Sequence, residues 1–278
     1  MKSATKKNAC KVLVIDVGGT HIKVLASGER IKREIVSGLS VTASRMVRDV
    51  KRLTADWKYD VVSMGYPGPV VHGRPLKEPY NLGGGWVGFH YGRAFGRPIK
   101  IVNDAAMQAL GSYQGGRMLF LGLGTGLGSA MIAEGVLQPM ELAHLPYKKG
   151  KTYEDYVGLR GLKRFGKKKW RRHVAEIVEE LRDALEAEYV VLGGGDARLL
   201  KELPPGVRLG DNDNAFRGGF RLWATNRGAS ERLSAPAERG ESNGVGLVEA
   251  RAPAFAGRAR GQSPRRRSSQ TIAAASGS

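Results

Sequence analysis

Short apolar runs alternate with amphipathic segments over the first 223 residues of the chain. The apolar runs predict buried strands, and apolar residues repeated every three or four positions predict helices. Strands are expected at 12–17, 22–27, 31–36, 59–65, 99–103, 118–123, 129–134 and 189–193. Helices are expected at 42–55, 88–96, 104–114 and 168–187, with shorter ones near 153–165, 196–202 and 214–223. This mixture predicts an α/β protein with two lobes and a ligand cleft between them.

The alternating pattern ends at Ala224. Residues 224–278 consist mainly of Arg, Ser, Ala, Gly and Pro, without the periodicity of a helix or a strand. We therefore expect a low-complexity tail that is disordered or loosely attached. A nucleic-acid-binding arm is the alternative, but the abrupt change in residue usage favours a tail without function.

The composition adds a strong positive charge. The 278 residues include 45 Lys and Arg against 26 Asp and Glu, which gives a formal net charge of +19. The tail holds nine Arg against four Glu, so most of the excess belongs to the residues before it. Such a charge predicts an anionic partner: nucleic acid, a membrane surface or another polyanion.

Other compositional features narrow the location and the metal chemistry. No apolar run approaches the roughly 18 to 20 residues of a membrane span. The start of the chain leaves no room for the apolar region of a secretory signal, so a cytoplasmic protein is expected. The single cysteine, Cys10, excludes an internal disulfide and a cysteine-based structural zinc site.

The first candidate site follows the first predicted strand. Asp16 ends the apolar run, and the chain then turns through Gly18, Gly19 and Thr20 into a second run. A carboxylate at a strand end can hold a hydrated Mg²⁺, and glycines let backbone N–H groups approach a phosphate. These groups suit the phosphate tail of a nucleotide. An ordinary Gly-Gly hairpin is the alternative.

A second candidate site lies where the strand at 99–103 meets a helix. Open α/β sheets place ligands at such strand ends. Asn103 can hydrogen-bond to a polyol, and Asp104 can accept a proton from a hydroxyl. Alternatively, Asp104 is simply the N-cap of the helix.

Glycines recur after two more strands. Gly124, Thr125 and Gly126 lie between two apolar runs, and their spacing fails the dinucleotide fingerprint, which needs G-x-G-x-x-G at the start of a helix. They are better explained as a second phosphate-binding hairpin, with a tight β-turn as the alternative. The glycines at 193–195 either lie against an adenosine or turn a corner. The segment at 161–168 nearly matches a P-loop but lacks its Ser or Thr, so we reject it.

A last polar group comprises Glu141, His144, Glu154 and Asp155. Glu141 and His144 are spaced to face the same way on one helical turn. Zinc would need more ligands than this pair provides, whereas hydrogen bonds to sugar hydroxyls suit it. Solvent-facing polar residues are the alternative.

Taken in order along residues 11–223, these motifs resemble the ROK family of sugar kinases and sugar-sensing repressors. The segment from Asp16 to Lys23 is similar to the family's first phosphate motif. The segments at 122–128 and 193–195 are similar to its second phosphate motif and its adenosine motif. The resemblance implies phosphate or nucleotide binding by Asp16, Gly18, Gly19, Thr20, Lys23, Gly124, Thr125, Gly126, Gly193, Gly194 and Gly195.

The resemblance also implies the sugar site and the fold. Asp104 matches the family's catalytic base, and sugar contacts are implied for Asn103, Glu141, His144, Glu154, Gly68 and Asn81. The implied fold is the actin-like, ribonuclease H-like duplication, with lobes at 1–103 and 104–213 around a central cleft. A closing helix at 214–223 would return to the N-terminal lobe.

Two departures from the family pattern refine the expectation. The cysteine-rich zinc motif of many members is absent from 146–153, so no zinc is expected. No helix-turn-helix precedes Lys11, which argues against the repressor branch. The short, lysine-rich body looks most like the polyphosphate glucokinase branch.

The implied activity is transfer of a phosphoryl group from ATP, inorganic polyphosphate or both to a hexose hydroxyl, expected to be the glucose 6-OH. Asp104 would act as the base, and Asp16 would hold Mg²⁺. Polyphosphate would bind cations at Arg160, Lys163, Arg164, Lys167, Lys168, Lys169, Arg171 and Arg172, although a solvated face is the alternative.

Neither a membrane nor nucleic acid is expected as a partner, and a homodimer is left open. The competing hypotheses are a non-catalytic, sugar-responsive binding protein or regulator of the same family, and an inactive relic. The sequence does not decide which hexose is used, which donor is preferred, the oligomeric state or the role of the tail.

Overall fold

The structure is a computed structural model that describes residues 10–211 and 213–224. All of them belong to one of the two compact units of the chain, Met1–Asn226. The expectation of a disordered tail concerns residues 224–278, which lie outside the described residues except for Ala224.

The first half of the described chain forms a five-stranded sheet in the order β3-β2-β1-β4-β7. Its strands are β1 (Val12–Val17), β2 (His21–Ala26), β3 (Arg33–Val36), β4 (Val61–Tyr66) and β7 (Ile99–Asn103). β1, β2 and β3 are antiparallel neighbours, whereas β4 and β7 run parallel to β1. β1 and β4 are buried almost throughout, as their continuous apolar sequences predict.

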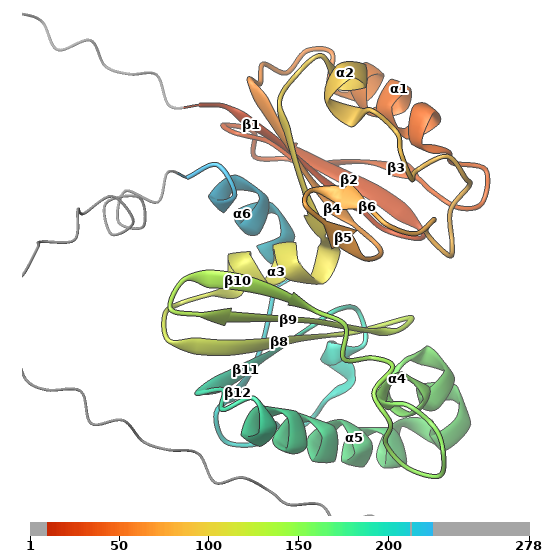
Figure 1. Ribbon diagram of the computed structural model, residues 1–278, viewed down its shortest axis with the longest axis vertical. Coiled ribbons are helices and arrows are strands. Elements are labelled where there is room, and N and C mark those ends of the chain that lie inside the picture. Colours follow the sequence, from red (N-terminus) through yellow and green to blue (C-terminus); the bar gives the residue numbers. More distant parts are fainter. Residues whose placement is uncertain (1–9, 212, 225–278) are drawn as a thin grey trace, which may run out of the picture. The chain divides into compact units, whose positions relative to one another are not determined.

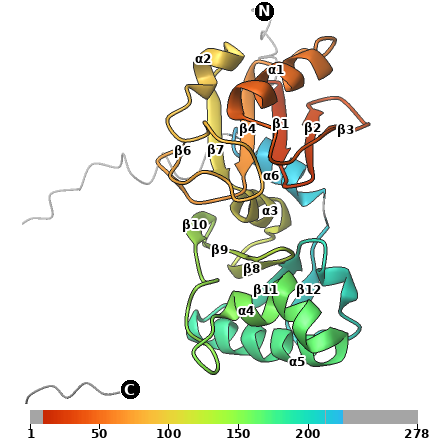
Figure 2. The same cartoon turned by 90° about the vertical axis from the view of Figure 1, so that its right-hand side faces the viewer.

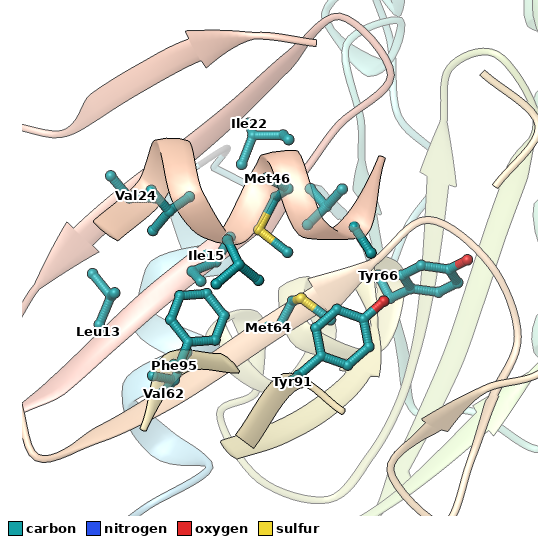
Figure 3. Close-up of a cluster of buried hydrophobic side chains, with 14 of the residues drawn as sticks. Leu13, Ile15, Ile22, Val24, Met46, Val62, Met64, Tyr66, Tyr91 and Phe95 are labelled. Atoms are coloured by element: carbon teal, nitrogen blue, oxygen red, sulfur yellow. The ribbon is translucent and has the colours of Figure 1, made fainter. Parts of the chain in front are cut away.

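Two helices cover one face of this sheet, α1 (Ala43–Leu53) and α2 (Tyr91–Phe95). Figure 3 shows the core between these helices and the sheet, in which Met46 of α1 and Phe95 of α2 pack on strand residues such as Ile15 and Met64. Thr42 caps α1 by accepting a hydrogen bond from the backbone N–H of Arg45. Apolar burial on this face fixes the orientation of the strands whose ends carry the candidate site.

The second half repeats this arrangement with a five-stranded sheet in the order β10-β9-β8-β11-β12. Its strands are β8 (Arg117–Leu123), β9 (Leu127–Ala133), β10 (Val136–Met140), β11 (Tyr189–Gly193) and β12 (Val207–Leu209). Three antiparallel strands are again followed by two that run parallel to the central one. The repeated topology confirms the predicted duplicated α/β fold.

The outer face of the second sheet is covered by α5 (Leu159–Ala184). Trp170, Val174, Ile177 and Leu181 of α5 are buried there, as helical spacing predicts. The preceding helix, α4 (Tyr153–Val157), has a capping box in which Thr152 and Asp155 satisfy each other's backbone N–H groups.

Two helices lie between the sheets, α3 (Asp104–Ser112) and α6 (Asn214–Arg221) (Figures 1 and 2). α6 packs on β1 and β4, and α3 packs on both α6 and the inner face of the second sheet. The two helices approach closely because Gly111 of α3 faces the backbone of Asn214, where a Cβ would overlap. The Ser63 hydroxyl of β4 also donates to the Gly219 carbonyl of α6 at 2.6 Å.

Several sequence-based boundaries were wrong. The strands β10 and β12 and the two-residue pair β5 (Val70–Val71) and β6 (Arg74–Pro75) were not predicted, because they are short or partly polar. The helix expected at 153–165 is divided at Gly158, and its second part continues through a break at Gly166 into the helix expected at 168–187. The helix near 196–202 is only a 3₁₀ turn, Ala197–Leu199.

Among the described residues, no helix is both long enough and apolar enough to span a membrane.

Candidate active site

A cavity of about 1070 Å³ is lined by residues of both halves of the fold. Its walls include the β1–β2 turn, the start of α3, the β8–β9 turn and the start of α5. The structure brings together at this cavity Gly18, Gly19, Thr20, Gly68, Asn81, Asn103, Asp104, Gly124, Thr125, Gly126, Glu141, His144, Glu154 and Gly194. Four predicted site residues do not line it: Asp16, Lys23, Gly193 and Gly195.

The β1–β2 turn is closed by its own backbone. The Gly18 N–H donates to the His21 carbonyl at 3.1 Å, and Thr20 is exposed at the cavity. Gly19 lies against the side chain of Asn81, where a Cβ would be only 3.3 Å from the Asn81 Cβ. A larger residue at Gly19 would therefore push Asn81 away from the cavity.

Asp16 and Lys23 are direct neighbours across β1 and β2, and neither lines the cavity. Burial raises the pKa of Asp16, and the positive charge of Lys23 opposes this shift. The Asp16 carboxylate nevertheless acts on the site, because its charge reaches Asp104.

Asn103 ties the start of α3 to the loop after β4. Its Oδ1 accepts hydrogen bonds from the backbone N–H groups of Ala105 at 2.9 Å and Ala106 at 3.3 Å, and its Nδ2 donates to the Gly68 carbonyl at 3.1 Å. The N-cap of α3 is therefore Asn103, and the alternative that made Asp104 the cap was wrong. Asp104 is left as the first residue of the helix, at the cavity wall.

Asp104 has an unusual protonation equilibrium. Burial raises its pKa to about 7, the nearby charge of Asp16 adds to the shift, and Glu141 contributes a smaller increase. A hydrogen bond from the Ala105 N–H, at 2.8 Å to Oδ1, opposes these effects. A carboxylate with a pKa near neutrality is suited to exchange a proton with a substrate hydroxyl.

The β8–β9 turn forms the opposite wall. The Gly124 N–H donates to the Gly126 carbonyl at 3.2 Å, and Thr125 is exposed. The Leu159 N–H donates to the carbonyls of Gly124 and Thr125 at 2.9 and 3.3 Å, so the start of α5 is fixed to this turn. Gly194, with a φ of 82°, also packs on the backbone of Leu123, where a Cβ would overlap.

Glu141, His144 and Glu154 meet at the cavity although the last two are ten positions apart in the sequence. The intervening chain folds back on itself, so that the Tyr153 N–H donates to the Leu145 carbonyl at 3.2 Å. The Glu154 N–H donates to the Ala143 carbonyl at 3.0 Å, between the other two polar residues. This hairpin explains how a sequence-distant glutamate joins the pair.

Sequence reasoning missed several lining residues. Arg160 was predicted to be one of the surface cations that bind polyphosphate, but it lines the cavity and pairs with Glu154 at 3.4 Å. Tyr80 lines the cavity and is 93% exposed. Its position directly before Asn81 was the only available signal. Gln108 of α3 is partly buried, lines the cavity and had no signal of its own.

The remaining predicted cations form a separate group on α5, the cationic cluster: Lys163, Arg164, Lys167, Lys168, Lys169, Arg171 and Arg172. Arg171 donates to the Leu199 carbonyl at 2.7 Å, and the other six members are exposed. Within the described part of the chain, no member of the cluster has a carboxylate partner within 4.0 Å. The described residues also contain no group of three or more His, Cys, Asp or Glu side chains arranged to hold a metal.

Comparisons with known proteins support the resemblance. The polyphosphate glucokinase of Mycobacterium tuberculosis is 26% identical over 215 residues, which cover 69% of this chain and 80% of that protein. The fold matches the inorganic polyphosphate/ATP-glucomannokinase of Arthrobacter sp. strain KM, with a TM-score of 0.65 and 22% identity over 78% of this chain and 99% of the other.

The fold also matches a ROK family glucokinase from Streptomyces griseus, with a TM-score of 0.61 and 16% identity over 76% of this chain and 98% of the other. No family model matches the chain. The predicted resemblance is confirmed: polyphosphate glucokinases are homologues of this protein, and its actin-like fold is that of the ROK family sugar kinases.

Proposed function

We propose that this protein is a hexose kinase that transfers a phosphoryl group to the 6-OH of glucose. The observation that carries the proposal is the position of Asp104, whose pKa is about 7, in one cavity with two glycine turns. The homologous polyphosphate glucokinases support the same reaction class.

Each wall of the cavity has a role in this reaction. Asn103, Asn81, Gly68, Glu141, His144 and Glu154 would hold the sugar hydroxyls. The turns around Gly18–Thr20 and Gly124–Gly126 would hold the donor phosphates with the backbone N–H groups that do not close the turns themselves. The glycines at 193–195 would lie against the adenosine when ATP is the donor, although only Gly194 reaches the cavity wall.

Asp104 then acts on the attacking hydroxyl. Its carboxylate accepts the proton of the 6-OH while the O6–P bond forms and the bond from phosphorus to the bridging oxygen breaks. ADP, or a polyphosphate shortened by one unit, leaves with the electron pair of that bond. Because the transition state of phosphoryl transfer is loose, rate enhancement depends mainly on positioning and charge neutralisation. We propose that the lobes at 1–103 and 104–213 close on the substrates and exclude water.

Asp16 is the residue that suits Mg²⁺. It is a carboxylate at a strand end, and burial raises its pKa although the positive charge of Lys23 opposes the shift. Mg²⁺ commonly binds one or two carboxylates and completes its shell with water and substrate phosphates, so a larger protein cluster is not required. When bound, the ion would neutralise charge on the donor phosphates.

The cationic cluster supports inorganic polyphosphate as a donor in addition to ATP. Its exposed charges lie on the helix that begins at the cavity, so a long polyanion held in the cavity could extend along them. Binding of this kind releases counterions and weakens steeply as salt increases.

A coupled assay of hexose phosphorylation, with Mg²⁺ and either ATP or polyphosphate, tests both proposals. The proposed function requires turnover of glucose, and failure with every hexose tried would reject it. For the donor, the variant K167Q/K168Q/K169Q should raise the KM for polyphosphate and reduce its salt dependence, with the KM for ATP unchanged. A matched triple variant on α1, R48Q/K51Q/R52Q, should change neither. Equal behaviour of the two triple variants would exclude the cationic cluster as the polyphosphate site.

A further inference from the structure

The charge of the cavity wall is unfavourable for a phosphoryl donor. Asp104, Glu141 and Glu154 line the cavity, and among the described lining residues Arg160 is the only Lys or Arg. A polyphosphate chain or a nucleotide triphosphate brings several more negative charges into this space. Among the described lining residues, Arg160 is therefore the permanently cationic side chain available to contact the phosphates directly.

In this structure Arg160 is engaged with a carboxylate. Its guanidinium lies 3.4 Å from Glu154 Oε1 and 3.9 Å from Asp155 Oδ1. The Arg160 side chain is 76% exposed, so this ion pair is screened by water and costs little to break. Arg160 also directly follows Leu159, whose N–H is bonded to the β8–β9 turn, so its backbone is fixed at the donor wall.

Glu154 is engaged with the same wall. Its Oε2 accepts a hydrogen bond from the backbone N–H of Leu127 at 3.4 Å, and it lies directly against Gly126, where a Cβ would overlap the carboxylate. The carboxylate thus lies between a backbone N–H of the glycine turn and a guanidinium. These two donors are the partners that a phosphate oxygen prefers.

We propose that Arg160 and the Leu127 N–H form a phosphate-binding pair, and that the donor's terminal phosphate displaces Glu154 from it. The released Glu154 carboxylate then turns to the sugar hydroxyls. This inference rests on the proposed function and adds a coupling between its two substrates. Because a binding linkage is reciprocal, sugar that engages Glu154 must raise the affinity for the donor by the same factor.

Arg160 is therefore a catalytic residue that contacts the donor, and Glu154 is shared between the two subsites. Removing Arg160 should weaken donor binding and abolish the coupling. Removing the charge of Glu154 should weaken sugar binding yet leave donor binding intact or stronger, because the competing anion is gone. These opposite effects on donor affinity distinguish an exchange from a simple structural ion pair, whose two partners would give the same phenotype.

Isothermal titration calorimetry of the full chain tests this, with glucose as one ligand and the non-hydrolysable analogue AMPPNP or inorganic tripolyphosphate as the other, in excess Mg²⁺. For the wild type we expect each ligand to raise the affinity for the other at least about fivefold. R160Q should bind the phosphate ligand about tenfold more weakly and lose the coupling. E154Q should bind it at least as tightly as the wild type, again without coupling.

The control is R48Q, because Arg48 is 72% exposed, pairs with the carboxylate of Asp49 and does not line the cavity. It should behave as the wild type. R160K, which keeps the charge but loses the planar fork, should fall between R160Q and the wild type.

Wild-type turnover measured on the same preparation separates the two proposals. If the wild type phosphorylates glucose while R160Q keeps full donor affinity, or E154Q loses it, the exchange is wrong and the proposed function stands. If the wild type binds neither ligand and phosphorylates no hexose, both are wrong.

Discussion

The side-chain amide of Asn103 donates to the Gly68 carbonyl at 3.1 Å, while its oxygen caps α3. One side chain thereby fixes the helix that carries Asp104 and the loop that follows β4. The cap and the loop contact use different atoms of Asn103, so substitutions can separate them.

Asn103→Ser keeps an oxygen that can cap the helix but is too short to reach Gly68, whereas Asn103→Ala loses both contacts. We expect Asn103→Ala to lower the free energy of unfolding by about 1 kcal/mol, and Asn103→Ser by a few tenths. Both should raise the KM for glucose, because each releases the loop at Gly68 and removes the amide proposed to hold a sugar hydroxyl. Urea denaturation and steady-state kinetics measure the two effects. A normal KM in Asn103→Ser would exclude a role for the Gly68 contact in sugar binding.

The pH dependence of activity should report Asp104. Its carboxyl must be ionised to accept the hydroxyl proton, and its pKa is raised to about 7. We therefore expect kcat/KM for glucose to fall about tenfold per pH unit on acidification below pH 7. Because the charge of Asp16 is one cause of the raised pKa, Asp16→Asn should move this acid limb to lower pH, in addition to any loss of turnover. An acid limb that stays in place in Asp16→Asn would contradict the coupling.

The same shift has a consequence for stability. The folded protein keeps the Asp104 proton up to about pH 7, whereas an unfolded chain releases it near pH 4. Ionisation of Asp104 therefore destabilises the fold progressively as the pH rises from about 4 to 7. Asp104→Asn removes this cost and keeps the oxygen that accepts the Ala105 N–H.

We expect Asp104→Asn to raise the Tm by roughly 2–4 °C at pH 8, equivalent to about 1 kcal/mol, and by less at pH 5. Differential scanning fluorimetry at both pH values measures this. Asp183→Asn is the control, because Asp183 is 73% exposed and outside the cavity. A destabilised Asp104→Asn at pH 8 would show that its carboxylate is well compensated in the fold.

The hairpin that delivers Glu154 is held to α5 by Glu176. The Tyr147 hydroxyl and the Lys148 ammonium both donate to Glu176 Oε2, at 2.5 and 2.6 Å. These hydrogen bonds, with that of Lys148 the larger contribution, lower the pKa of Glu176 to about 2. The contact should therefore persist throughout the pH range in which Asp104 titrates.

Glu176→Gln should raise the KM for glucose a few fold with little change in kcat, because it loosens the position of Glu154 without touching the reacting atoms. Its acid limb near pH 7 should remain unchanged. Glu179→Gln, on the same helix, is the control. A loss of kcat with a normal KM would show that Glu176 acts on the chemical step instead of on sugar positioning.

Much of the fold could be predicted because its central strands have strong patterns. The run at 12–17 is almost entirely buried, and the run at 99–103 ends at the polar pair Asn103-Asp104. The predicted bounds of both strands therefore match those of β1 and β7. The edge strand β10 is largely exposed and contains Pro139, so its own sequence has no strong strand pattern. Its conformation depends more on pairing with β9, which the sequence pattern does not reveal.

The candidate site was harder to predict wherever long-range contacts decide it. The role of Asn103 as loop anchor depends on Gly68, which is 35 residues away. Arg160 looked like one more surface cation, but the hydrogen bonds from Leu159 to the β8–β9 turn hold the start of α5 at the cavity. Sequence spacing carries no information about such contacts.

The central claim is that Asp104 directs phosphoryl transfer to a hexose hydroxyl. The most direct test is ³¹P NMR of glucose mixed with Mg²⁺ and ATP or polyphosphate, in the presence of wild-type protein or of Asp104→Asn shown to be folded. The account predicts a phosphomonoester at C6 with the wild type, and formation at least about 10²-fold slower with the variant. Equal rates with both proteins, or no phosphomonoester from any hexose with the wild type, would contradict it.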